Sequence, residues 1–564
     1  MDRRSDRRSE RAMDRREFLR LLGIGAGAAA LAACTPSTSA PTATASAAAG
    51  ATAEPLTLPI VSSPLTLSYW CPMSSNVVAT MKTFGEIAAY KELEKRTGIH
   101  LEFQHPPLNS ETEQFNLLTA SGKYPDVIEY NWLTNAPGGP ARFLKDGVII
   151  RLNELIDKYA PNLKAVLAKH PEWKKQIVTD EGDIYAFPFI RSDVKLLVST
   201  GLAVRQDWLD KLGLKTPTTL DEWRTMLTAF KQRDPNGNSK PDELPLSTWA
   251  SSPGPGGGSR GAFSRYSFIG AWGIGQDWYQ ENGTIKYGPL QPEFRDFLQT
   301  MAQWYKEGLI DADVFATTQA SFDAKVTGNL VGAASMQGGN GIGKYAGLMA
   351  GKGTFKLTPV QQPVLKAGDK ILLGGRDNNY PGQGSAAISS QNKNVTQTVK
   401  MLDYAYSTEG SLLFNFGIEG LSYKMVNGVP TYTDVLMRDP QVPSAQMISR
   451  YARGNFNGPF VQDVRYIEQY YELPEQKKAF DVWTLPSNEK LLPPMTPTQD
   501  EAKKFATTMS DIQTRYDEVV TRVWSGKAGL DEWDSFVKAL PGMGITDALK
   551  IQQSTLDRYN KRPG

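Results

Sequence analysis

The chain has 564 residues, of which 40% are hydrophobic, so it is long enough to bury a large core and to form two or more domains. Its 62 basic and 60 acidic residues nearly balance and do not gather into a basic patch, which argues against a nucleic-acid partner. Two cysteines exclude a fold that is held together by a framework of disulfides.

The first 33 residues have the layout of a signal peptide. Several arginines, including the pair Arg15-Arg16, precede an uncharged run from Leu21 to Ala33. This run is shorter than the roughly 20 apolar residues that a membrane-spanning helix needs. The paired arginines before Phe18 resemble a twin-arginine export signal, although a general secretory signal also contains arginines. We therefore expect export and leave the route open.

The uncharged run ends in Leu31-Ala32-Ala33-Cys34, which resembles the lipobox of bacterial lipoproteins, in which the cysteine is acylated, for example with palmitate. The alternative is a buried cysteine that follows small residues. Residues 34–63, rich in alanine, threonine, serine and proline, predict a flexible tether. Cleavage before Cys34 would leave a net charge of about −1 and Cys71 as the remaining thiol. We expect lipid anchoring on the outer face of the cytoplasmic membrane.

The globular pattern begins at Pro64 and predicts alternating strands and helices. Apolar residues alternate over 65–70 and 99–103, and residues 126–130 form a third strand-like run. Between them, helical spacing over 84–93 predicts a helix that stops at Gly98, and residues 115–118 predict a short helix that ends at Ser121-Gly122. This strand–helix–strand order implies a parallel sheet.

Farther along, Thr219 and Glu222 have the spacing of a capping box at the start of a helix with one apolar stripe. Helical patterns also cover residues 293–308 and most of the chain from about 499, where Trp524, Trp533 and Phe536 are expected to pack against a neighbouring layer. The Gly- and Pro-rich stretch 251–258 lacks the Lys-Ser/Thr ending of a phosphate-binding loop, so we expect a plain connection.

Residues 234–243 place oxygen-bearing side chains at alternate positions around Gly237, like the front half of an EF-hand loop. The twelfth position is Pro245 where an EF-hand has glutamate, so Glu243 would have to supply that ligand. We expect a structural Ca²⁺ site here; the alternative is an ordinary Asp-Pro-Asn-Gly turn with solvated charges. The candidate ligands are Asp234, Asn236, Asn238, the backbone carbonyl of Lys240, Asp242 and Glu243.

Six segments in this order carry a resemblance to a known family: Ala120–Ile128, Ile184–Pro188, Arg205–Leu214, Pro217–Trp223, Tyr406–Gly410 and Phe416–Gly420. Together with the lipobox, they resemble the extracellular solute-binding proteins of family 1, particularly the long sugar-importer lipoproteins related to alginate-oligosaccharide-binding proteins. Those relatives carry calcium at a loop similar to residues 234–243.

The resemblance implies an α/β fold of the class II periplasmic-binding-protein type, with two lobes hinged around a cleft. Beyond the signal peptide (1–33) and the tether (34–63), it divides the chain into an N-terminal lobe (64–200 and 339–405) and a C-terminal lobe (201–338 and 406–564). Crossings are expected near Val198–Leu202, Met336–Gly343 and Tyr404–Thr408. It further implies a monomer that is not an enzyme, and that captures a carbohydrate, expected to be an oligosaccharide, and delivers it to ABC permease subunits.

Sugars stack on aromatic rings and bond to planar polar groups, so the best candidates are such residues at strand ends and glycine-rich turns near the presumed cleft. For each of them, packing or surface exposure is the alternative. Arg376 would favour an acidic sugar, but one arginine does not decide this. The candidates are Trp70, Asn131, Trp132, Trp272, Gln337, Asn340, Arg376, Asp377, Glu419 and Tyr423.

Three other readings stay open. A secreted glycosidase or lyase would use a similar cleft with two placed carboxylates. However, the sequence contains no Gly-x-Ser-x-Gly or His-Glu-x-x-His motif, and His100, His105 and His170 lack metal-ligand spacing. A binding module that signals to a membrane receptor is the second alternative, and a peptide ligand is the third.

Overall fold

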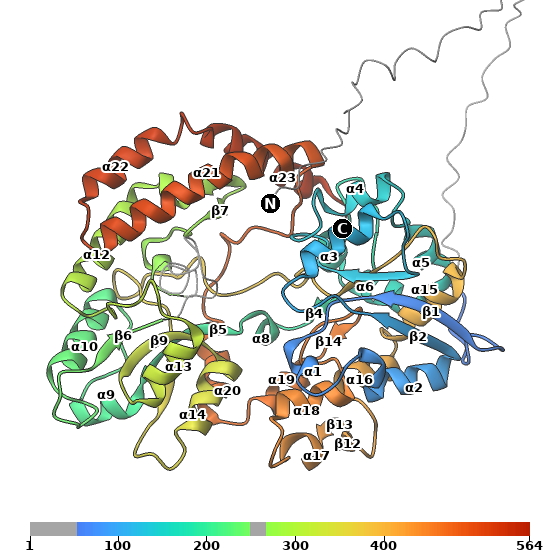
Figure 1. The fold of residues 1–564 in the computed structure, drawn as a ribbon, viewed down its shortest axis with the longest axis horizontal. Coiled ribbons are helices and arrows are strands. Elements are labelled where there is room, and N and C mark those ends of the chain that lie inside the picture. Colours follow the sequence, from blue (N-terminus) through green and yellow to red (C-terminus); the bar gives the residue numbers. More distant parts are fainter. Residues whose placement is uncertain (1–52, 249–266, 564) are drawn as a thin grey trace, which may run out of the picture. The chain divides into compact units, whose positions relative to one another are not determined.

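The computed structural model describes residues 53–248 and 267–563. The signal peptide, Cys34, most of the expected tether and the stretch 251–258 lie outside these residues. The described chain contains two four-stranded sheets, which lie in separate parts of the ribbon (Figure 1). Each sheet has its own hydrophobic core. Residues that pack with the first sheet are called the first region below, and those that pack with the second sheet the second region. The fold is mixed α/β, as the sequence predicts.

The first sheet has the strand order β11-β3-β1-β2. β1 pairs in parallel with β2 and β3, which confirms the predicted parallel arrangement, whereas β11 is antiparallel to β3. Alternation in β1 places Leu67 and Tyr69 in the core. The strands are β1 (Leu65–Trp70), β2 (Ile99–Gln104), β3 (Val127–Tyr130) and β11 (Ser385–Ile388).

The helices around the first sheet follow the predicted order with one shift. Residues 84–86 form a 3-10 turn that Thr83 caps, so the following helix begins at Ala88. It ends at Gly98, whose φ of 77° suits glycine. The elements are α1 (Ser75–Val78), η1 (Phe84–Glu86), α2 (Ala88–Thr97), α3 (Glu111–Ala120), α4 (Gly139–Lys145), α5 (Asn153–Tyr159), α6 (Pro161–Lys169), α7 (Pro171–Ile177) and α15 (Val395–Tyr404).

The second sheet has the order β10-β5-β9-β6, with β5 antiparallel to both β10 and β9. The predicted capping box is present, since Thr219 and Glu222 each accept the other's backbone N–H at the start of α10. The strands are β5 (Thr200–Arg205), β6 (Leu244–Leu246), β9 (Val331–Gln337) and β10 (Leu357–Val360), beside the hairpin β7 (Trp278–Glu281) and β8 (Thr284–Tyr287). The helices are α9 (Gln206–Leu212), α10 (Leu220–Gln232), η2 (Ile269–Trp272), η3 (Gly288–Leu290), α12 (Pro292–Lys306), α13 (Gln319–Thr327), α14 (Lys344–Leu348) and α20 (Pro474–Trp483).

The chain passes between the two sheets at places that differ in part from those expected. The first passage between the sheets runs through α8 (Val194–Leu197), between β4 (Ile190–Arg191) and β5, next to the expected range Val198–Leu202. After β9 the chain stays in the second region, because η4 (Gly338–Gly343) and α14 lead to β10, which pairs with β5. The return therefore lies between β10 and β11. The next crossing follows Tyr471, where α20 packs on β10, and does not lie near residues 404–408.

A buried ion pair fixes the segment 406–471 to the first region instead of the C-terminal lobe that the sequence predicted for it. Arg453 donates to Glu129 on β3 and to the Tyr90 hydroxyl, both at 2.6 Å. The Arg453 and Glu129 side chains are 1% and 2% exposed. The segment contains α16 (Thr408–Phe416), β12 (Tyr423–Val426), β13 (Val429–Tyr432), α17 (Asp434–Met437), α18 (Ser444–Tyr451), β14 (Val461–Gln462) and α19 (Val464–Tyr470), and β14 pairs with β4.

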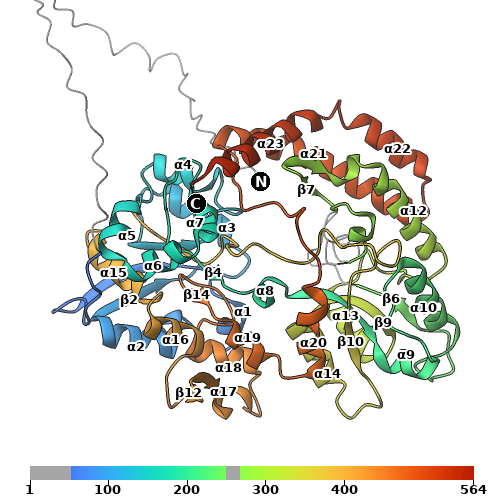
Figure 2. The ribbon, with the colours of Figure 1, turned by 180° about the vertical axis from the view of Figure 1, so that it is seen from behind.

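Three C-terminal helices cover the second region, in red in Figure 2. Trp524, Trp533 and Phe536 join its hydrophobic core, which confirms their predicted packing. The last helix also reaches the first region, where Arg558 and Arg562 each donate to Asp180 at 2.7 Å. The helices are α21 (Gln499–Trp524), α22 (Leu530–Ala539) and α23 (Ile545–Lys561).

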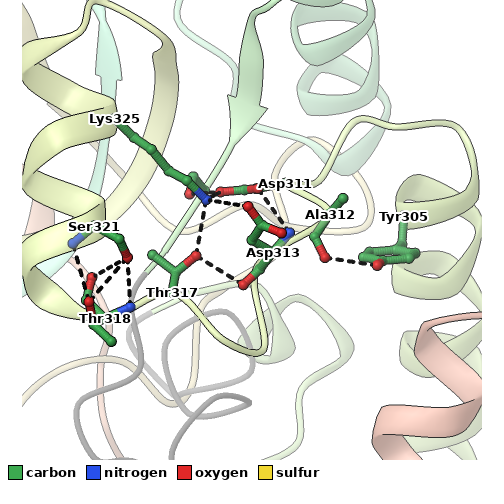
Figure 3. Close-up of polar contacts among 9 residues, drawn as sticks. Tyr305, Asp311, Ala312, Asp313, Thr317, Thr318, Ser321 and Lys325 are labelled. Carbon is green, nitrogen blue, oxygen red and sulfur yellow. Dashed lines mark hydrogen bonds and ion pairs between the residues drawn. The ribbon is translucent and has the colours of Figure 1, made fainter.

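A polar cluster ties α13 to the segment after β6 and α12 (Figure 3). Lys325 donates to Asp311 at 2.7 Å and to the Thr317 hydroxyl at 3.2 Å. Asp311 also accepts the Ser247 hydroxyl at 2.6 Å. Asp311 is almost fully buried, and a buried carboxylate needs a cation, which Lys325 supplies. The cluster therefore serves the packing of the second region.

The end of the expected tether packs on the first region. The backbone N–H of Glu54 bonds to Lys158, the N–H of Ile60 bonds to Thr97, and Leu56 and Ile60 contact the first core. The packed chain therefore begins before Pro64. In the described residues, no helix combines the length and the apolar character that crossing a membrane would require.

Candidate functional site

A pocket of about 220 Å³ lies where residues of the two regions meet. The first region contributes Asn76 of α1, Arg191 of β4 and Tyr466 of α19, whereas Gln337 at the end of β9 and Asn340 in η4 come from the second. The other lining residues are Lys195, Leu196, Val198, Ser199, Gly339, Ala445, Asn455, Phe456, Gln462, Ile467, Tyr470 and Tyr471.

Both cations of the pocket lining have carboxylate partners. Arg191 donates to Asp377 at 3.2 Å, and Lys195 donates to Glu468 at 2.5 Å. The hydrogen bond from Lys195 to Glu468 raises the pKa of Lys195, so this side chain stays protonated at neutral pH. The pocket therefore holds two ion pairs and no isolated positive charge on its described lining residues.

Three tyrosines form the aromatic part of the lining. The rings of Tyr466 and Tyr470 stack at 5.9 Å between centroids, and Tyr471 stacks on Phe480 at 5.1 Å. Gly338 makes room for them, because a Cβ atom there would lie 2.4 Å from the Tyr471 hydroxyl. The absent side chain thus lets the end of β9 approach the tyrosines closely.

Five carboxamides complete the polar surface. Asn455 and Gln462 are partly used within the protein, since they donate to the carbonyls of Ala445 and Gly454. Asn76, Gln337 and Asn340 are different: their amide groups make no hydrogen bond within the described residues, and Gln337 and Asn340 are exposed. These amides are available to a ligand. The described lining contains no Asp, Glu or His.

The loop 234–243, between α10 and β6, is held by its own side chains. Asp234 accepts the backbone N–H groups of Gly237 and Asn238 at 2.9 and 3.1 Å. The amides of Asn236 and Asn238 donate to Asp242 at 3.0 Å, and these bonds lower the pKa of the Asp242 carboxyl.

Glu243 distinguishes this loop from a simple turn. Its Oε1 atom is buried and has no hydrogen-bond partner in the described chain. Burial, with a contribution from the nearby charges of Asp234 and Asp242, raises the pKa of Glu243. An unpaired buried carboxylate oxygen next to two other carboxylates is a place that a hard cation would stabilise. In the described residues, however, no group of three or more His, Cys, Asp or Glu side chains is arranged to hold a metal ion.

A family model for the bacterial extracellular solute-binding proteins matches residues 75–411. The chain belongs to this family. The expected class of function, the substrate-binding component of an ABC transporter and not an enzyme, is therefore confirmed.

Two curated relatives extend the similarity. This solute-binding protein is 27% identical over 510 residues to the fructooligosaccharide ABC transporter substrate-binding protein FusA of Streptococcus pneumoniae, which covers 86% of this chain and 90% of FusA. It is 24% identical over 367 residues to the lipoprotein LipO of Bacillus subtilis, covering 60% of this chain and 65% of LipO.

Solved structures give the same fold. A structure of the alginate-binding protein AlgQ2 without calcium ion is 28% identical, with a TM-score of 0.68, over 88% of this chain and 99% of that one. A structure of an EF-hand mutant of the Streptococcus pneumoniae FusA protein in complex with fructo-nystose is 25% identical, with a TM-score of 0.67 over the same shares. The expected periplasmic-binding-protein type of fold is confirmed.

Of the ligand-binding candidates in this solute-binding protein, Gln337 and Asn340 line the pocket. Asp377 is not a lining residue, but it forms an ion pair with the lining residue Arg191. Arg376, its neighbour in sequence, is half-buried and is not part of the lining. These two lining amides and Asp377 are the candidates that the structure brings together.

Three other candidates pack in the first region. Trp132 is fully buried and donates to the carbonyl of Ser385 at 3.0 Å, and Trp70 packs against Phe115 and Tyr130. Asn131 accepts the N–H of Thr134 and so closes a turn. Packing and turn formation, the alternatives given for them, describe these positions.

The remaining candidates lie elsewhere. Trp272 lines a separate cavity with Asp221 and Arg224 in the second region. Tyr423 is buried against Phe416, next to the exposed Glu419. Sequence reasoning missed Asn76, Arg191, Lys195 and the tyrosines. The Tyr-x-x-x-Tyr-Tyr spacing of residues 466–471, directly before a new helix, is the one local signal that pointed to the aromatic part.

Proposed function

We propose that this solute-binding protein captures an oligosaccharide outside the cell and delivers it, chemically unchanged, to an ABC-type permease. The observation that carries the proposal is the pocket between the two regions, which is lined by available amides and stacked tyrosines. Aromatic rings and planar polar groups are what bind sugar faces and hydroxyls. FusA, whose name specifies fructooligosaccharides, and the alginate-binding AlgQ2 support a carbohydrate ligand.

We infer that the two regions act as hinged lobes, the first formed by residues 53–198 and 376–471 and the second by 199–375 and 472–563. Gln337 and Asn340 approach the pocket from the second region, and Asn76 and Tyr466 from the first. Closure would therefore bring complementary groups onto the ligand and exclude water. The closed form would then be presented to the permease, and we propose that a monomer suffices for this.

We propose further that the chain is exported through its N-terminal signal and is held on the membrane by lipid on Cys34. The lipobox-like sequence and the similarity to the lipoprotein LipO support this anchor. Replacement of Cys34 by alanine should release the protein into the medium, and unchanged retention in the membrane fraction would contradict the anchor. We propose the twin-arginine route for this export, because the pair Arg15-Arg16 precedes Phe18 as in such signals.

We also propose that Ca²⁺ binds the loop 234–243, with Asp234, Asn236, Asn238, the Lys240 carbonyl, Asp242 and Glu243 as ligands. The unpaired buried oxygen of Glu243 supports the presence of a cation in this loop. The similar FusA protein, whose solved structures include an EF-hand mutant, supports it as well. A bound Ca²⁺ would supply positive charge and cross-link the loop. Because the loop joins α10 to β6 in the second region, its role would be structural.

A thermal-shift screen of the chain from residue 35 onward, against neutral and acidic oligosaccharides and peptides, tests the main proposal. A saccharide at a hundred times its Kd should add about 2.7 kcal/mol of stability. Chromatography of the same mixture should return the saccharide intact, whereas shortened products would indicate a glycosidase. Stabilisation by peptides alone would overturn the carbohydrate proposal.

A further inference from the structure

We propose that the ligand is an uncharged oligosaccharide, and not a uronic-acid oligomer. This inference rests on the proposed function and narrows its ligand class. The names of the similar proteins leave the point open, since AlgQ2 binds alginate and FusA is named for fructooligosaccharides. The charges and the available hydrogen-bonding groups of the pocket decide between the two.

The first argument is the neutralised charge of the pocket. Arg191 and Lys195 are the cations of the described lining, and each has a carboxylate within hydrogen-bonding distance, Asp377 and Glu468 respectively. A uronate would have to compete with these built-in carboxylates for the same cations. It would also meet their negative charge at short range. A neutral sugar meets neither obstacle, so these charges weaken the binding of the acidic ligand relative to that of the neutral one.

The second argument is the chemistry of the groups that remain available. Asn76, Gln337 and Asn340 have no hydrogen-bond partner for their amides in the described chain. A carboxamide offers both a donor and an acceptor, and a sugar hydroxyl also donates and accepts, so the two match pairwise. In a uronate, a carboxylate that only accepts replaces the C6 hydroxyl, so an amide oxygen that faces this position would lose its donor in the closed pocket.

The third argument is the aromatic surface. Tyr466 and Tyr470 stack with an angle of 16° between their rings, next to Tyr471 and Phe456. Such rings suit the apolar C–H face of a sugar, whereas a negative charge over a ring face is repelled by its quadrupole. Two ion pairs, three available amides and a tyrosine surface thus all favour a neutral saccharide.

The test compares matched pairs of ligands by isothermal titration calorimetry. Each pair consists of a neutral oligosaccharide and its C6-oxidised uronate, of the same length and linkage. The neutral member should bind at least about tenfold more tightly, the ratio that 1.4 kcal/mol produces. Tighter binding of the uronate would overturn this inference while leaving the oligosaccharide proposal intact. No binding of either member across the panel would overturn both.

Two variants sharpen the comparison. Glu468→Gln removes the partner of Lys195, so the ratio of the uronate affinity to the neutral-sugar affinity should rise by up to about fivefold. Asp534→Asn makes the same change of charge on α22, where Asp534 pairs with Arg295, and should leave both affinities unchanged. Equal effects of the two variants, or no rise of this ratio in Glu468→Gln, would contradict the role given to the paired charge.

Discussion

Removal of Arg453 should loosen the segment 406–471 from the first region. The Arg453 guanidinium bonds to Glu129 and Tyr90 at 2.6 Å and to Asn457 at 3.2 Å, and it lies 4.3 Å from the centre of the Phe84 ring. Arg453→Met keeps much of the side-chain volume but leaves the Glu129 carboxylate buried without its cation. The loss of one partner of a buried pair costs about 3–5 kcal/mol, a large part of the total of about 5–15 kcal/mol expected for a protein.

Hydrogen exchange followed by mass spectrometry measures this loss locally. Peptides from α16 to α19 and from β3 should lose protection by about 3 kcal/mol or more in Arg453→Met. The matched control is Arg295→Met, which breaks an exposed pair with Asp534 and should cost less than about 1 kcal/mol. The double variant Glu129→Leu/Arg453→Met should regain most of the loss, because no charge stays buried. Equal protection in Arg453→Met and Arg295→Met would refute the assignment of this segment to the first region.

Three further predictions concern pH, the pocket and the calcium loop. Burial raises the pKa of Asp403 to about 6, above its unfolded value of about 4, so the folded state binds this proton more tightly. The stability that the protonated Asp403 contributes should therefore be complete below pH ~4 and fall by up to ~3 kcal/mol as the pH rises to about 6. Denaturant titrations should show this fall in the wild type relative to Asp403→Asn, and parallel curves would contradict it. Gly338→Ala should displace Tyr471 and weaken saccharide binding about tenfold by calorimetry, whereas Gly347→Ala, which meets no atom within 4 Å, should not; equal affinities would argue against the tyrosine surface. Millimolar Ca²⁺, but not Mg²⁺, should raise the Tm of chelator-treated protein, and less so in Glu243→Gln; no rise in the wild type would remove the calcium proposal.

Local features of the fold could be predicted from the sequence. β1 and β2 follow from alternating residues within each strand, the stop at Gly98 from a position that requires positive φ, and the start of α10 from a capping box that spans four residues. Each of these features depends on residues that are close in sequence, so the local sequence pattern reveals it. Their order also gave the parallel pairing of the first sheet, because helical connections bring parallel strands side by side.

The paths between the sheets could not be predicted in the same way. The pairing of β10 with β5 joins Leu357 to Arg205, and the pair Arg453–Glu129 joins residues 324 positions apart. No local pattern carries these contacts, so the expected lobe boundaries at 339 and 406 did not match them. Amphipathic helices such as α16 and α20 show an apolar face without showing which sheet covers it.

A place in the pocket lining could be predicted for residues at the end of a strand. Gln337 ends β9 and Asn340 follows two glycines, so both were identified as candidates. Tyr470 ends α19 and Tyr471 lies between α19 and α20, and both look like ordinary core aromatics until η4 is packed against them. For Trp132 the prediction fails in the other direction. Its place after a strand suggested contact with a ligand, but its indole N–H donates to the carbonyl of Ser385 within the core.

Calorimetric titration of the wild type and of the double variant Gln337→Ala/Asn340→Ala, with the neutral saccharide that stabilises the wild type best, tests the central claim most directly. Loss of hydrogen bonds from both amides should weaken binding by about tenfold or more, while the melting temperature of the unliganded protein stays the same, because neither amide bonds to the protein. Undiminished affinity in the double variant would place the ligand elsewhere and contradict the account.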